Sequence, residues 1–415
     1  MQSTTSDRNR VSGGRSFAIN SLLALGAVLL TLATLEGCAR LVDLRPETNS
    51  ENEIPAWVEE AHLQHDSSWL IPIARGGGLS RYFDLFEWDR YRFYRLRKNA
   101  KLEMIDFTAP AEVRDRTKWH VETNSHGFRD REFAAPGPGS TFRIAAVGDS
   151  STFGWGVDEP LSFVAVAESM LAAKYPEIDI EVLNFGTPGH SSFQGLQLLQ
   201  EVLQDETLDA VWFSFGANDR LPTGVSEAEQ YARRASWIGA IQAVLQNSQA
   251  YQTGVAWRDH WRGPRSAEDI PIPEPGATVT ENVTLIEYTG NLRQAAQLAQ
   301  AHDRPFALIS SCLDREGIRA MRRVAREQQV PFVNGLQTMM SRIPELQSGD
   351  LASEEVARVV EGYGAKSLQR WGSRGWVLMP DRCHPNVVGH RLIGEAIAEV
   401  TSAWIAERES AASLH

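Results

Sequence analysis

The sequence predicts an α/β fold in which a parallel sheet is covered by helices on both faces, giving a three-layer α/β/α domain. From residue 140 onward, short apolar runs alternate with segments of helical spacing, and each run ends in a small or polar cluster. Such alternation is typical of buried parallel strands joined by helices. A long uncharged stretch near the N-terminus predicts a transmembrane helix. Between the two we expect a small N-terminal β-rich prefix.

Composition and charge narrow the class of protein. The chain of 415 residues is 42% hydrophobic and 23% charged, as expected of a folded protein, and its net charge is −12. Because no stripe of Lys and Arg is available to bind phosphates, we expect no nucleic-acid partner. Cys and His show no metal-ligand spacing, so no metal is expected either.

The N-terminal segment indicates the compartment. Residues 1–15 form a basic tail, and residues 16–36 form the membrane segment, whose first twenty residues carry no charge. A helix of twenty residues rises about 30 Å, which is enough to cross the hydrocarbon layer. The preceding arginines favour a cytoplasmic N-terminus. We therefore expect a membrane-anchored protein whose main domain is extracytoplasmic, in the periplasm.

Two alternatives to an uncleaved anchor stay open. The segment could be a cleaved signal peptide, although it is longer than a usual signal core. It could also belong to a lipoprotein, because residues 35–38 resemble a cleavage box ending at Cys38, where Glu36 fits poorly. Each alternative also places the body of the protein outside the cytoplasm.

The remaining chain divides into a linker, the prefix and the main domain. Residues 37–81 are interpreted as linker and residues 82–139 as the β-rich prefix, because aromatic and basic residues alternate there. The main domain, residues 140–410, is expected to contain strands at 142–147, 180–183, 210–215, 305–309 and 331–333, with helices at 161–175, 193–203, 315–328 and 387–405. Residues 220–285 interrupt this rhythm and are interpreted as an insertion that forms a lid, a substrate wall or a structural flap.

Two clusters at predicted strand ends suggest a nucleophile and an oxyanion site. In parallel sheets, ligands bind beyond the carboxyl ends of the strands. Gly148-Asp149-Ser150 follows the first strand, and a serine there is a nucleophile if a base takes its proton. Residues 184–189 follow the second strand, and their glycines let a backbone N–H approach a developing oxyanion. Alone, each cluster could equally be an ordinary turn.

Two further clusters supply an amide and a base. Asn218 follows the third strand, where its side chain can donate a hydrogen bond, although Asn-Asp there could also be a helix cap. His384 precedes the last helix and has the pKa of a general base near neutrality. Asp381, three residues earlier, can accept the other imidazole N–H and fix the tautomer.

Together the four clusters resemble the conserved blocks of the SGNH/GDSL hydrolases: Gly-Asp-Ser, a Gly, Gly-x-Asn-Asp and Asp-x-x-His. The resemblance covers about residues 140–408 and implies a flavodoxin-like three-layer sheet. It implies that Ser150 is the nucleophile, His384 the base and Asp381 its orienting partner. It implies no metal or organic cofactor.

The resemblance also implies an oxyanion hole. The backbone N–H groups of Ser150 and Gly189 and the side-chain amide of Asn218 would form it, with Gly186 as an alternative to Gly189. The segment 123–129, Thr-Asn-Ser-His-Gly-Phe-Arg, is similar to one that precedes Gly-Asp-Ser in membrane-anchored bacterial members.

The function implied is that of a serine hydrolase that cleaves O-acyl esters through an acyl-enzyme. Its substrate would be an acylated small molecule, lipid or polysaccharide outside the cytoplasm, and its N-terminal helix would bind the membrane. One alternative is an O-acyltransferase in envelope polysaccharide modification. Another is an inactive carbohydrate-binding scaffold, which the presence of every expected site residue disfavours.

Several other residues near the clusters are interpreted as structural: His126, His190, His390, Asp149 and Asp219. Cys312 follows the fourth strand and Cys383 adjoins His384, so both should lie near one rim of the sheet. We hypothesise that they form a disulfide that braces the His384 loop, and two separate thiols are the alternative.

Overall fold

The computed structural model describes residues 8–42, 79–106, 108–133, 141–205, 207–223, 225–262, 280–312, 314–349, 351 and 353–412. The chain forms two compact units. One contains the N-terminal helix together with residues 237–264, and the other contains residues 50–236 and 265–415. Most of the expected linker and the end of the prefix lie outside the described residues.

The larger unit is built on a five-stranded sheet in the order β11-β10-β7-β5-β6, with every neighbouring pair parallel. The strands are β5 (Thr141–Gly148), β6 (Asp179–Gly186), β7 (Ala210–Ser214), β10 (Phe306–Ser310) and β11 (Phe332–Asn334). The chain goes from β5 to β6 on one side and then crosses to β7 on the other. In such sheets the ligand crevice lies where the strand order reverses, at the carboxyl end of β5.

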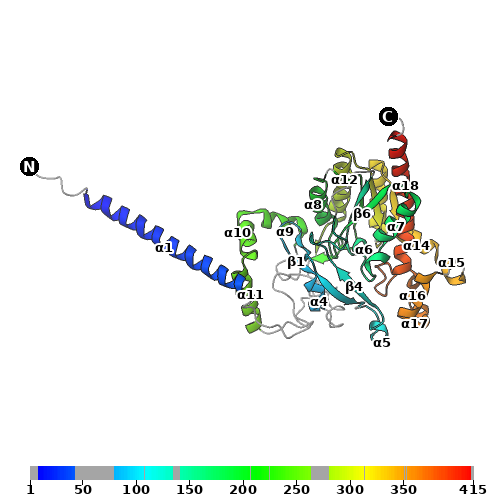
Figure 1. The fold of residues 1–415 in the computed structure, drawn as a ribbon, viewed down its shortest axis with the longest axis horizontal. Coiled ribbons are helices and arrows are strands. Elements are labelled where there is room, and N and C mark those ends of the chain that lie inside the picture. The colour runs from blue at the N-terminus through cyan, green and yellow to red at the C-terminus, as the bar shows by residue number, and fades with distance from the viewer. Residues whose placement is uncertain are drawn as a thin grey trace, which may run out of the picture. The chain divides into compact units, whose positions relative to one another are not determined.

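Alternate residues of the strands face different helical layers. Ile144 and Ala146 of β5 pack in the same core as α7 (Phe163–Lys174) and α18 (Val387–Ala412). Ala145 and Val147 pack in a second core with α8 (Ser192–Val202), α12 (Leu285–Ala301) and α13 (Arg315–Gln328). Figure 1 shows α8 and α12 on one side of the sheet and α7 and α18 on the other. Burial on both faces explains the near-continuous apolar strands, and the predicted three-layer α/β/α fold is confirmed.

The prefix forms two antiparallel hairpins. One pairs β1 (Phe86–Asp89) with β2 (Phe93–Leu96), and the other pairs β3 (Lys101–Ile105) with β4 (Lys118–Glu122). Short helices α4 (Leu79–Asp84) and α5 (Ala111–Arg114) accompany them. Buried side chains of the hairpins, such as Trp119, join one apolar cluster with Phe153 and Trp155 from the loop after β5. The prefix therefore packs on the edge of the sheet that carries the predicted site.

The described parts of the segment 220–285 and of the stretch after β11 are mainly helical. The first contains α9 (Glu227–Ala235), α10 (Trp237–Gln246), α11 (Gln249–Arg262) and a short pair of strands, β8 (Pro222–Thr223) and β9 (Thr280–Glu281). After β11 come α14 (Gly335–Ser341), α15 (Ile343–Ser348), α16 (Glu354–Tyr363) and α17 (Ala365–Trp371); single 3₁₀ turns lie at Glu159–Leu161 and Ser373–Trp376. Neither α12 nor these four short helices were predicted.

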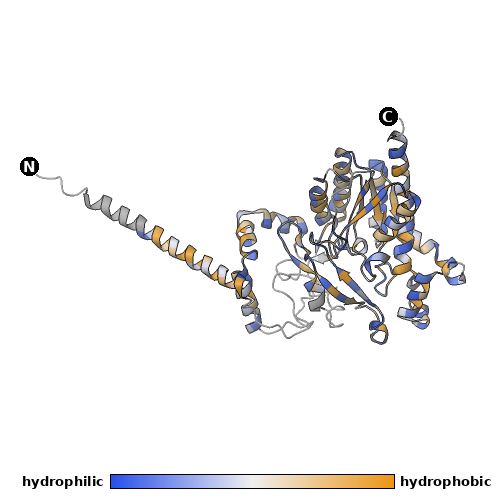
Figure 2. Cartoon of the chain, viewed as in Figure 1, coloured by the Kyte–Doolittle hydropathy of each residue, from blue (hydrophilic) through white to orange (hydrophobic). Residues whose placement is uncertain are grey.

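The smaller unit begins with α1 (Arg8–Leu41), which extends beyond both ends of the predicted membrane segment. Its part Asn20–Leu41 is long and apolar enough to cross a membrane, by length and composition. A signal sequence passes the same test. Figure 2 shows this apolar part of α1 and the apolar α10.

Candidate active site

Ser150 lies directly beyond β5, where three strand ends are in register. Gly148 pairs with Gly186 of β6 and with Ser214 of β7. Ser150 begins the single-turn helix α6 (Ser150–Phe153), which the Asp149 carboxylate caps by accepting the Ser151 N–H at 2.9 Å. A side chain at Gly148 would come within 1.9 Å of the Thr152 hydroxyl. The Gly-Asp-Ser sequence is therefore what this tight strand-to-helix turn requires.

His384 and Asp381 reach Ser150 from the loop before α18. The His384 Nε2 lies 2.7 Å from the Ser150 Oγ, and its Nδ1 lies 2.5 Å from an Asp381 oxygen. The other Asp381 oxygen accepts the backbone N–H groups of Cys383 (2.9 Å) and His384 (3.0 Å). Because a carboxylate only accepts, the proton belongs on Nδ1, and Nε2 is free to accept the proton of Ser150. The structure thus brings the three predicted residues into one hydrogen-bonded chain.

Electrostatics favour the protonated form of His384. Burial by itself would lower its pKa, but the negative charge of Asp381 and its hydrogen bond outweigh burial and raise the pKa above the ordinary value. The pKa of Asp381 is lowered although burial opposes this, because the positive charge of His384 and the two backbone N–H groups stabilise the carboxylate. An imidazolium formed by taking the proton of Ser150 would therefore be stabilised where it forms.

A disulfide joins the His384 loop to the end of β10. The structure links Cys312 to Cys383, while Cys38 is free and exposed. The hypothesised pairing is confirmed, and the alternative of two separate thiols is wrong. The cross-link lies one residue from His384 and two from Asp381, so it restrains the loop that carries both.

The backbone at Gly189 adopts a left-handed conformation that favours glycine. Its φ is +81°, and a side chain there would lie 2.4 Å from the Tyr94 hydroxyl. That hydroxyl donates to the Pro188 carbonyl at 3.0 Å and fixes the turn. The Asn218 amide donates to the His190 carbonyl at 2.9 Å, which places it beside Gly189. The predicted oxyanion residues Gly189 and Asn218, from the loops after β6 and β7, therefore lie together.

The alternative glycine is already engaged. The Gly186 N–H donates to the Asn184 side chain at 2.9 Å. Within the described part of the chain, the N–H groups of Ser150 and Gly189 have no such acceptor. This difference favours Gly189 over Gly186 as a donor to a bound oxyanion.

A buried polar network supports the turn after Gly189. Asp219 accepts the Ser192 N–H at 3.1 Å and also its hydroxyl, and Asn291 donates to that hydroxyl at 2.9 Å. Glu227 accepts the Ser191 hydroxyl. Burial raises the pKa of Asp219 to about 7 and raises that of Glu227 well above its usual range. Glu227 and Asn291 carried no sequence signal, because they come from the segment 220–285 and an unpredicted helix.

Arg129 supports the loop after Ser150. The sequence assigned it no role beyond ending the segment 123–129, which is similar to one in membrane-anchored bacterial members of the family. It is fully buried and donates to the carbonyls of Phe153 (3.0 Å), Gly154 (2.7 Å), Val157 (2.7 Å) and His120 (2.7 Å). Its guanidinium also lies over the ring of Trp119. Arg129 thus ties the prefix to the loop that follows Ser150.

The other titratable residues have structural contacts. The His390 Nδ1 accepts the Phe163 N–H at 3.1 Å, and burial lowers the pKa of His390 to about 3, so it is neutral. His190 contacts the Tyr94 carbonyl at 3.0 Å, and His126 stacks on a phenylalanine. Burial raises the pKa of Asp149 to about 6 while it caps α6. In the described part of the chain, no group of three or more His, Cys, Asp or Glu could hold a metal ion.

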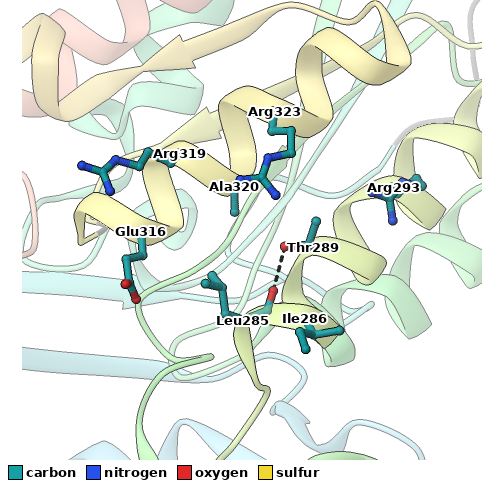
Figure 3. Close-up of a pocket in the computed structure, with 8 residues that line it drawn as sticks. All are labelled: Leu285, Ile286, Thr289, Arg293, Glu316, Arg319, Ala320 and Arg323. Carbon is teal, nitrogen blue, oxygen red and sulfur yellow. Dashed lines mark hydrogen bonds between the residues drawn. The ribbon is translucent and has the colours of Figure 1, made fainter.

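A separate cavity of about 450 Å³ lies between α12 and α13 (Figure 3). Its lining consists of Leu285, Ile286, Thr289, Arg293, Glu316, Arg319, Ala320 and Arg323. None of the predicted site residues lines it, so this cavity is distinct from the Ser150 site.

Several solved structures are similar to part of this chain. They include the esterase EstA from Pseudoalteromonas sp. (15% identity, 64% of this chain and 98% of that chain, TM-score 0.35). They also include the acetylxylan esterase Axe2 from Geobacillus stearothermophilus (19%, 63% and 94%, TM-score 0.35) and a lipase/acylhydrolase from Enterococcus faecalis (19%, 62% and 94%, TM-score 0.36). No curated protein matches the chain.

The family of GDSL-like lipases and acylhydrolases matches over residues 146–392, which is more than half of the chain. This match runs from the strand before Ser150 to the helix after His384, and it confirms the resemblance seen in the four sequence clusters. The chain belongs to the GDSL-like lipase/acylhydrolase family and is an ester-hydrolysing enzyme.

Proposed function

We propose that this enzyme is a serine esterase in which Ser150 is the nucleophile and His384 the general base. The observation that carries the proposal is the continuous hydrogen-bonded chain from Asp381 through His384 to Ser150. His384 takes the proton of Ser150 as its oxygen attacks the ester carbonyl, and then gives that proton to the departing alcohol. Water, deprotonated by His384, releases the acid from the acyl-enzyme.

The oxyanion of each tetrahedral intermediate would be held by three donors. These are the N–H groups of Ser150 and Gly189 and the amide of Asn218. The Asn218 amide has two hydrogens, and the bond to the His190 carbonyl uses one of them. Because such donors are fixed before the reaction, losing one costs about 10²–10³ in rate.

The substrate proposed is an acylated carbohydrate or lipid outside the cytoplasm, with α1 as the membrane anchor. Two features support this location. The α1 helix has the length and composition of a membrane span, and a disulfide of the kind that persists in oxidising compartments lies beside His384.

The test compares full-length wild type with Ser150→Ala and Ser310→Ala. Ser310 is a matched control, because it is a buried serine at the end of β10, another strand of the same sheet, outside the Ser150–His384 pair. Each protein, in detergent, is given p-nitrophenyl esters of increasing acyl length and, separately, a fluorophosphonate. We expect Ser150→Ala alone to lose turnover and the covalent adduct. A wild-type protein that forms the adduct without turnover would point to acyl transfer onto a specific acceptor. A folded wild-type protein that shows no adduct and no turnover would contradict the proposal.

A further inference from the structure

The helix α10 presents a large apolar face that the described residues of the chain leave exposed. Its sequence contains no charged residue. Trp237 is 74% exposed and Val244 71% exposed, and Ile238, Ile241 and Leu245 are also exposed. These five positions follow a helical spacing that puts them on one side of α10. A contiguous apolar surface of this kind marks an interaction site.

The next helix, α11, carries a pair of tryptophans that are also exposed. Trp257 and Trp261 lie four residues apart, on one side of the helix, with ring centroids 5.9 Å from each other. Trp261 is 79% exposed. Tryptophan is enriched where a membrane meets water, because its ring is apolar and its N–H is polar.

The same compact unit contains α1, and a single carboxylate joins α1 to the start of α11. Glu36 accepts the Ser248 hydroxyl at 2.7 Å and the backbone N–H groups of Gln249 and Ala250 at 3.1 Å each. It also pairs with Arg40 at 2.7 Å. A carboxylate at a helix N-terminus satisfies donors that otherwise have no partner in the helix.

The position of Glu36 also indicates where the proposed membrane helix leaves the hydrocarbon layer. It is the first charged residue after the uncharged residues 16–35, so it belongs at the boundary between hydrocarbon and water. The turn between α10 and α11 is therefore held at that boundary. Figure 1 shows α10 and α11 running across the end of α1 rather than along it. Helices oriented across a membrane span lie in the plane of the membrane surface.

We propose that α10 and α11 form a second membrane contact, lying in the surface of a phospholipid bilayer at the C-terminal end of α1. The apolar residues of α10, with Trp257 and Trp261 of α11, would enter the boundary between headgroups and acyl chains, as amphipathic surface helices do. The inference rests on the anchoring of α1 proposed above. It adds a segment of the 220–285 region to the part of the enzyme that binds lipid.

The test measures the depth of single labelled positions in the full-length chain. A Cys38→Ser background removes the free thiol, and Val244→Cys or Trp261→Cys then carries an environment-sensitive nitrobenzoxadiazole label, attached without reductant. Both positions are exposed, so labelling should not disturb packing. The matched control is Gln252→Cys, an exposed position on the side of α11 opposite Trp261.

The labelled proteins are placed in nanodiscs of phosphatidylcholine and phosphatidylglycerol that contain lipids with a doxyl quencher near the headgroup or deep in the acyl chain. We expect several-fold stronger quenching at 244 and 261 than at 252, and more from the shallow quencher than from the deep one. Equal quenching at all three positions would overturn the proposal. A blue-shifted label that lipid does not quench would also overturn it, because protein would then cover the face.

A mature chain that lacks residues 1–36, detected by intact mass, would overturn it as well. Ester hydrolysis is measured on the same nanodiscs. Its presence or absence bears only on the proposed catalytic function, so the two proposals fail separately.

Discussion

Replacing Asp381 by Asn isolates the orienting role proposed for this carboxylate. The amide oxygen of Asn can keep the bonds from the Cys383 and His384 N–H groups, now 2.9 and 3.0 Å long. The amide nitrogen would face the His384 Nδ1, where the carboxylate oxygen now lies at 2.5 Å. Since an amide N–H donates, Nδ1 must become an acceptor, and the imidazole proton moves to Nε2. In that tautomer His384 cannot accept the proton of Ser150.

The expected loss is large because the loop should stay folded while the base is in the wrong tautomer. The corresponding change in a serine protease lowers kcat about 10⁴-fold, which corresponds to about 5 kcal/mol at 1.36 kcal/mol per factor of ten. The residual activity should also change its pH dependence. Asp381 holds the pKa of His384 above its ordinary value, so without that charge the rise of activity should move to lower pH.

The assay is kcat and KM for p-nitrophenyl acetate across the range in which histidine titrates. Asp158→Asn serves as the control, because Asp158 pairs with His120 at 3.3 Å on the exposed surface. We expect this control to keep wild-type activity. If Asp381→Asn, with an unchanged melting temperature, keeps activity within about tenfold of wild type, the orienting role is refuted.

Three further changes test other parts of the site. Gly189→Ala places a side chain at φ +81°, 2.4 Å from a tyrosine hydroxyl. We expect kcat to fall about 10²–10³-fold. The control Gly290→Ala, whose new side chain meets nothing within 4 Å, should match wild type. Arg129→Lys cannot keep all four carbonyl bonds of the buried guanidinium, so the free energy of unfolding from urea titration should fall by about 3 kcal/mol, and an unchanged midpoint would contradict this. Replacing both Cys312 and Cys383 by Ser opens a loop of sequence separation 71 and should lower the free energy of unfolding by about 4 kcal/mol. The measurement is the melting temperature, which should fall. Equal melting temperatures of variant and wild type would show that the cross-link does not stabilise the fold.

The central sheet could be predicted because its strands are buried on both faces. Burial demands apolar residues at successive positions, and the runs ending at Gly148 and Gly186 stand out from the helices between them. The site clusters could be predicted for the same reason, since the ends of parallel strands share one edge. The catalytic roles assigned to them stay predictions that the experiments above test.

The supporting contacts could not be predicted, because they join segments far apart in the chain. Tyr94 fixes the Pro188 carbonyl across 94 residues, and Glu36 caps α11 across 212 or more. A tyrosine in a hairpin or a glutamate after an apolar stretch has many possible partners, and only the tertiary structure selects one. The short helices after β11 were missed because each spans only two or three turns, too few for a clear periodicity.

The Ser150–His384 pair joins residues 234 positions apart, and this separation has a consequence for biosynthesis. The proposed nucleophile lies near the start of the matched family region, and its proposed base lies near the end of that region. Any nascent or truncated chain that ends before residue 384 therefore has the serine without a proton acceptor. Ester hydrolysis should thus begin only once the chain has been synthesised past residue 384 and His384 has folded against Ser150. Activity would consequently report that the two ends of the matched family region have folded together.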